Sequence, residues 1–144
     1  MANAALVAGT KTFTVTNKTA GSWTVTATDT YTTPLTANTG SAFAVNAGTF
    51  AKLQILAPGE VAAPGTATGK TAAAPTAQTA GTAFNVTVNA VDANWNLVNT
   101  AGDTVAITSS DPNATLPSNA ALSSGTQTFS VEFSTAASSI PSSS

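Results

Sequence analysis

The sequence contains no cysteine and no histidine, and its four basic residues are all lysine, so arginine is absent as well. Without these side chains the chain cannot form disulfides or the usual zinc and iron–sulfur sites, and it cannot carry serine–histidine or cysteine–histidine catalysis. Four scattered lysines give no cationic surface, so no nucleic-acid partner is expected. No apolar run approaches the roughly 18 residues of a membrane helix, so no membrane span is expected.

Charge of either sign is also scarce. Only 7% of the 144 residues are charged, with a net charge of -2, whereas soluble domains average about 25%. Threonine, alanine and serine take the place of the charged residues, a composition associated with bacterial and archaeal surface proteins. We therefore expect an extracellular or cell-surface protein with one compact domain or one and a half small ones.

Alternation of apolar and polar residues with a period of two dominates the chain, and no segment keeps the 3.6-residue period of a helix. Between Lys52 and Ile55, for example, Leu53 and Ile55 alternate with Lys52 and Gln54, so we expect Lys52 to face water. Turn signals and a long polar loop, which runs from Ala57 to about Thr82, separate the apolar segments. Strands are expected at residues 10–16, 22–29, 41–46, 50–56, 84–91, 96–99, 103–108 and 126–133. The fold class predicted is all-β, a Greek-key sandwich.

The chain contains an internal repeat. Residues 3–16 align with residues 119–132 at an offset of 116, and nine of the fourteen positions are identical. The similarity continues weakly as far as Thr19-Ala20 against Thr135-Ala136 and then ends. A period of this length is consistent with one sandwich and its loops, so the chain is expected to begin late in one unit and stop late in the next.

Three segments resemble the bacterial immunoglobulin-like repeats of large surface proteins, including the invasin and intimin type. They are residues 84–98, which contain the Asp-Ala-Asn turn, residues 105–110, and residues 19–29. Proteins of this family commonly have glycine at the position of Trp95. The resemblance implies an immunoglobulin-like fold and a role in rods, spacers, adhesin stalks or filaments outside the cell.

With the family's strands lettered A to G, the order along this chain becomes E, F, G, A, B, C, D, E. Residues 1–46 would hold strands E to G of one unit, residues 47–138 strands A to E of the next, and residues 139–144 a serine-rich tail. The link from Val45 to Phe50 spans at most about 17 Å. It is short for a return to the same sandwich and suits a step into the next one.

A unit that lacks strands F and G would leave an apolar groove between its sheets. Another copy's residues 22–46 could fill the groove by strand addition, and the contact would build a head-to-tail homo-oligomer, an open filament. The alternative is that the chain is a segment of a long tandem array. The residues expected to assemble are Trp23, Val25, Phe43 and Val45 on the donor side and Phe84, Val86, Val88, Phe129 and Val131 on the acceptor side.

Candidate ligand sites are weak. Asp29, Asp92 and Asn94 could bind calcium through oxygen atoms, although an Asp-Ala-Asn sequence more often caps a turn. No cofactor is expected. Three Asn-X-Thr triplets, at Asn17, Asn85 and Asn113, leave surface glycans possible, but a threonine-rich chain forms such triplets often.

No enzyme activity is expected, since the six acidic residues offer no evident catalytic pair. The function predicted is that of a structural subunit or repeat of an extracellular filament or adhesin stalk. The rival is a carbohydrate-binding or spacer module of a secreted multidomain protein, in which Trp95 could stack on a sugar or pack on a neighbouring domain.

Overall fold

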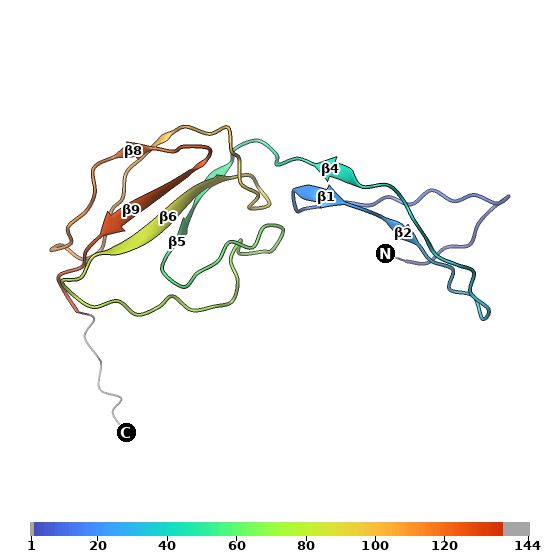
Figure 1. Ribbon diagram of the computed structural model, residues 1–144, viewed down its shortest axis with the longest axis horizontal. Coiled ribbons are helices and arrows are strands. Elements are labelled where there is room, and N and C mark those ends of the chain that lie inside the picture. Colours follow the sequence, from blue (N-terminus) through green and yellow to red (C-terminus); the bar gives the residue numbers. More distant parts are fainter. Residues whose placement is uncertain (1, 137–144) are drawn as a thin grey trace, which may run out of the picture.

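A computed structural model describes residues 2–136. These residues form nine strands and no helix, so the all-β prediction is confirmed. The strands belong to two parts, which we call the arm (residues 2–46) and the body (residues 50–136), and the arm extends away from the body (Figure 1). No helix among the described residues could cross a membrane. The serine-rich tail at 139–144 lies outside the described residues.

The arm is a narrow antiparallel ribbon. Strand β1 (Gly21–Trp23) pairs with β4 (Phe43–Val45), and β2 (Thr26–Ala27) pairs with β3 (Asn38–Thr39). A two-stranded ribbon has no second layer to cover its faces and is marginally stable by itself. Almost all residues of the arm are accordingly exposed.

The body is built on a three-stranded antiparallel sheet. Its middle strand β6 (Phe84–Val91) pairs with β5 (Lys52–Leu56) on one side and with β9 (Thr126–Val131) on the other. A small sheet of β7 (Thr104–Val105) and β8 (Ala120–Ala121) lies over one face. The apolar core between them consists of Val86, Val88, Ala90, Val105, Leu122, Phe129 and Val131.

The opposite face of the three-stranded sheet is polar and hydrogen-bonded. Gln54, Asn89 and Thr126 lie side by side on β5, β6 and β9. Thr126 Oγ1 donates to Asn89 Oδ1 at 2.8 Å, and Asn89 Nδ2 donates to Gln54 Oε1 at 3.1 Å. Gln54 Nε2 donates to the carbonyl of Gly69 at 2.7 Å, so the long loop after β5 is fastened onto this face and buries Gln54.

Several strand predictions need correction. Residues 10–16 form no strand, because no neighbouring segment pairs with them; only Thr10 takes part in an isolated bridge, with Val7. The strand expected at 22–29 is divided into β1 and β2, and the one expected at 96–99 is reduced to a bridge between Val91 and Leu97. Lys52 is half-buried rather than exposed, because its ammonium group lies 3.5 Å from the centre of the Trp95 ring.

Candidate assembly surfaces

The arm presents large apolar side chains to solvent. Trp23 and Phe43 are directly paired across β1 and β4, and both are exposed, as is Val25, whereas Val45 is half-buried. The Trp23 indole donates to the carbonyl of Thr19 at 2.9 Å, which holds the ring against the ribbon. The four donor residues predicted from the sequence are therefore brought together on the arm, outside the core of the body.

The body has an apolar face that is covered on one side and open on the other. Leu53 pairs with Ala90 and Ile55 with Val88, so their side chains project from the core face of the sheet. Ala90 and Val88 are buried under the small sheet, but Leu53 and Ile55 remain 46% and 48% exposed. The core thus continues into open apolar surface along β5.

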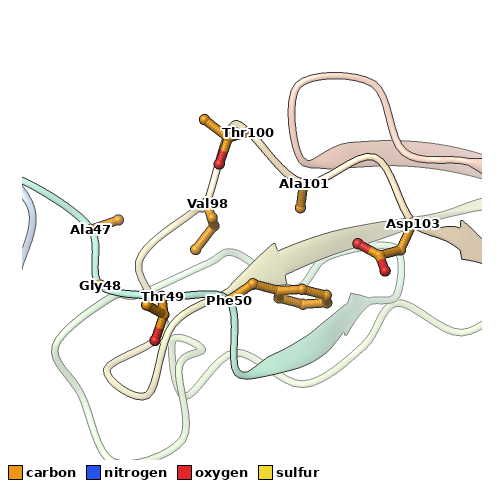
Figure 2. A pocket seen from close by; sticks show the side chains of 8 residues that line it. All are labelled: Ala47, Gly48, Thr49, Phe50, Val98, Thr100, Ala101 and Asp103. Carbon is orange, nitrogen blue, oxygen red and sulfur yellow. The ribbon is translucent and has the colours of Figure 1, made fainter.

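A groove of about 580 Å³ lies beside the start of β5. Phe50 and Thr49 line it from the chain leading into β5, and Val98, Ala101 and Asp103 line it from the segment before β7 (Figure 2). The Phe50 ring projects into the groove, and the residue is 39% exposed. The surface of the body is therefore hollowed beside the start of β5, with the Phe50 ring in the hollow.

A second groove, of about 780 Å³, lies near the start of β6. Phe84 and Phe133 line it and meet edge to face with ring centres 5.2 Å apart, and Pro75 and Ala136 also contribute. Of the acceptor residues predicted from the sequence, Val86, Val88, Phe129 and Val131 are buried in the core of the body itself, and Phe84 packs at the margin of that core and lines this groove.

The residues predicted from the sequence form the buried part of the apolar face of the sheet, and the open part of that face was not predicted. Phe50, Leu53 and Ile55, on the β5 side of the body's sheet, remain exposed. The signal was present in the alternation of Leu53 and Ile55. What the pattern could not show is which length of the face the small sheet leaves uncovered.

The two copies of the internal repeat form the same turn. Ala8 and Gly9 have φ of 51° and 79°, and the equivalent Ser124 and Gly125 have φ of 51° and 76°. In each copy the flanking residues exchange two backbone hydrogen bonds of 2.9 and 3.1 Å, between Val7 and Thr10 and between Ser123 and Thr126. Two consecutive positive φ values are typical of the type I′ hairpin turn.

The surroundings of the two copies differ. Leu122, Phe129 and Val131 are 5%, 3% and 3% exposed, whereas the equivalent Leu6, Phe13 and Val15 are 65%, 44% and 44% exposed. Gly125 lies so close to the backbone of Val98 that a Cβ would collide with its carbonyl, whereas nothing lies within 4 Å of a Cβ on Gly9. The first copy thus has the turn of the second copy without its strand and without its packing.

The calcium candidates are used as turn caps. Asp92 Oδ1 accepts hydrogen bonds from the backbone N–H of Asn94 and Asn96, at 2.8 and 2.9 Å, and Oδ2 accepts one from Gly48 at 2.8 Å. Asp29 caps a separate turn in the arm by accepting from Tyr31 and Leu35. Within residues 2–136 no three acidic side chains are grouped in a way that could hold a metal ion.

The electrostatics of Asp92 follow from these contacts. Burial by itself would raise the pKa of the carboxyl group, because it penalises the charged form. Hydrogen bonds from the Asn96 side chain and from the backbone of Gly48, Asn96 and Asn94 outweigh burial, so the pKa of Asp92 lies below its usual value. The carboxylate is therefore charged and satisfied at neutral pH.

Trp95 is half-buried against its own body. Its φ of 70° lies in the left-handed region that glycine prefers, so this chain keeps a glycine-type turn with a tryptophan in it. The indole donates to the carbonyl of Ala67 at 3.3 Å, and Lys52 lies over the ring. The ring packs on the loop that contains Gly69.

The three candidate glycan acceptors, Asn17, Asn85 and Asn113, are all exposed. Comparison with known protein families, with curated proteins and with solved structures found no match for this chain.

Proposed function

We propose that this chain is a structural unit of an extended extracellular filament or adhesin stalk, built from immunoglobulin-like sandwiches that complete one another by strand complementation. The arm supplies strands E to G of one sandwich, and the body supplies strands A to E of the next. Such a unit acts mechanically, by spacing and by continuity along the filament.

One observation carries the proposal: two copies of a fourteen-residue repeat share the same tight turn, but the second copy is packed in the body and the first is exposed in the arm. In the body, Phe129 and Val131 lie opposite Val86 and Phe84 of β6. The equivalent Phe13 would need a strand like β6, and the described residues contain no second strand of that kind. The apolar pattern of the arm is thus suited to a partner from another unit.

The open side of the body supports the same proposal from the acceptor side. Leu53 and Ile55 extend the core face beyond the small sheet, where the second sheet of an immunoglobulin sandwich would continue. Trp23, Val25 and Phe43 offer side chains of the size that such a gap requires. Fully burying a large apolar side chain contributes roughly 1.5–3 kcal/mol, and Trp23, Val25 and Phe43, which are 43–45% exposed, would gain part of this in such a gap.

Donor and acceptor are different surfaces of the same unit, which makes the contact heterologous. Heterologous contacts that do not close into a ring produce an open fibre. The arm also extends away from the body that follows it (Figure 1), as a donor that reaches another unit should. A filament with one polarity is the expected product.

The test is assembly of the purified chain, followed by light scattering after size-exclusion chromatography and by electron microscopy over a range of concentrations. We expect concentration-dependent filaments, and we expect Trp23→Asp or Phe43→Asp to block their growth. Thr24→Asp, on the same ribbon but at a polar position, is the matched control and should leave growth unchanged. Filaments that grow equally well from the Trp23→Asp and Phe43→Asp variants would overturn complementation through the arm.

The duplicated hairpin distinguishes complementation between separate chains from complementation within one polypeptide. In each body, strand β9 already pairs with the edge of β6. When a second copy donates its residues 22–46 to this body, no free edge remains for the residues 3–16 of that second copy, and they stay without a partner. In a covalent tandem of two such units, the donor surface of one unit and the acceptor surface of the other belong to a single polypeptide and meet at one junction. If separate chains stay monomeric and the tandem gains no stability over the single chain, the proposal is wrong in both forms.

A further inference from the structure

We propose that the turn Asp92–Asn96 is a joint that docks each sandwich onto the preceding one and sets the angle between them. Its partner is the backbone of the loop at residues 17–21, which in this chain belongs to the arm. The joint itself is a feature of the single chain. Only its recurrence along a filament rests on the proposed function.

The Asn96 side chain joins the two parts directly. Its Oδ1 accepts a hydrogen bond from the backbone N–H of Ala20 at 2.7 Å, and its Nδ2 donates to the carbonyl of Lys18 at 2.9 Å. The Asn96 amide thus contacts one donor and one acceptor of the same loop, which fixes the orientation of the loop as well as its distance from the turn. Asn96 is buried in this contact.

Asp92 holds Asn96 in place and also holds the connecting chain. Asn96 Nδ2 donates to Asp92 Oδ2 at 2.9 Å, and the same oxygen accepts from the backbone N–H of Gly48 at 2.8 Å. Gly48 lies between the arm and β5. The buried carboxylate therefore contacts the turn and the connection directly, and it contacts the arm loop through the Asn96 side chain.

A second, longer contact between the arm and the body lies beside the joint. Thr19 Oγ1 donates to the carbonyl of Pro64 at 3.4 Å, and Gly65 is so close that a Cβ there would collide with the Thr19 hydroxyl. Thr19 and Ala20 are half-buried, whereas Lys18 and Gly21 on either side are exposed. Burial in this part of the arm thus coincides with the contact to the Asn96 turn.

The internal repeat indicates where the next unit would dock. At an offset of 116, Lys18 and Ala20 correspond to Ser134 and Ala136, at the end of the body. The joint of a following unit would hydrogen-bond to the backbone of these two residues. Sandwiches connected by short links move freely unless an interface holds them, and this small polar contact would make the array a stiff rod of defined twist.

The absence of native cysteine allows the joint to be tested by spin labelling in the monomeric chain. Labels at Thr24→Cys in the arm and Thr108→Cys in the body occupy exposed positions. We expect a narrow distribution of distances between the labels, measured by pulsed dipolar spectroscopy in dilute solution. Asn96→Ala should broaden the distribution about twofold, because it removes both Asn96 hydrogen bonds and leaves only the long Thr19–Pro64 contact and the covalent link between arm and body.

Asn94→Ala is the matched control, because Asn94 lies in the same turn and its side chain is exposed. It should leave the distribution narrow. Hydrogen exchange of β6 and β9 checks that the body of the Asn96→Ala variant stays folded. If it does not, Ala20→Pro removes the arm's N–H donor without changing the body and gives the decisive measurement.

A distribution as narrow in the folded Asn96→Ala variant as in the parent chain would overturn the joint, as would an unchanged distribution in the Ala20→Pro variant when Asn96→Ala does not fold. A broad distribution in the parent chain would overturn it as well. Assembly is not measured in this experiment, so the joint can fail while strand complementation holds, and the reverse.

Discussion

Residues 3–16 and residues 119–132 are two similar peptides, identical at nine of fourteen positions, in two environments. Both form a tight turn with two positive φ values and the same pair of backbone hydrogen bonds. Only the second continues into a strand and enters a core, because β6 lies beside it. The comparison shows that the peptide's own sequence is enough to make the turn, whereas the strand and its burial require a partner.

The strongest test of this comparison is truncation of the equivalent phenylalanines. Phe129→Ala should destabilise the body by about 3–5 kcal/mol, because it removes a buried ring and leaves a cavity. Phe13→Ala should change the unfolding free energy of the monomer by less than about 0.5 kcal/mol, since Phe13 packs against no core. Urea denaturation measures both, and equal effects would contradict the difference in environment.

The next effect concerns the glycine of each turn. Gly125→Ala should cost about 2 kcal/mol or more, because the residue has positive φ and its Cβ would meet the Val98 carbonyl. Gly9→Ala carries the same φ strain but meets open space, so the stability of the body should be unchanged. Thermal unfolding of the two variants measures the loss of stability in each, and an equal loss in both would contradict the prediction.

Acid should loosen the contact between arm and body. The folded pKa of Asp92 lies below its unfolded value of about 3.9, so its stabilisation is complete above that pH and is lost as the pH falls through the folded pKa. Asp92→Asn should cost about 2 kcal/mol at neutral pH, because an amide would turn N–H groups toward the donors of Gly48 and Asn96.

Urea denaturation from pH 7 to pH 2 measures this dependence. The parent chain should lose the contribution of Asp92 at the acid end of the range, and the Asp92→Asn variant should lack that part of the pH dependence. Parallel curves for the two proteins would exclude Asp92 as its source.

The smallest expected effect on stability concerns Thr126 and Thr10, which occupy equivalent positions of the repeat. Thr126→Val should cost about 1 kcal/mol, because the hydroxyl donates to Asn89 Oδ1 within the polar row on the sheet. Thr10→Val should have no measurable effect in the monomer, since Thr10 is exposed and has no strand beside it. Denaturation midpoints resolve the pair, provided that the slopes of the two transitions agree.

The parts of the fold that the sequence predicted well are those with strong local signals. Strand β6 has the bounds expected from its alternation, and Asp92 caps the turn that its Asp-Ala-Asn sequence suggests. The predictions from sequence failed where the structure depends on which distant segments pair with each other. Residues 10–16 have a strand pattern and no neighbour, and Gln54 is buried because a distant loop offers the Gly69 carbonyl to its side chain.

The sequence by itself determined the features that belong to short segments. These are the alternation of side chains that makes the chain all-β, the turn residues, and the repeat that places the same turn at two positions 116 residues apart. Tertiary structure alone decided which copy is buried, how far the small sheet covers the face along β5, and that Asn96 reaches back to Lys18 and Ala20. The reason is physical. Burial and long-range hydrogen bonds depend on which surfaces meet, and a local pattern does not specify its partner.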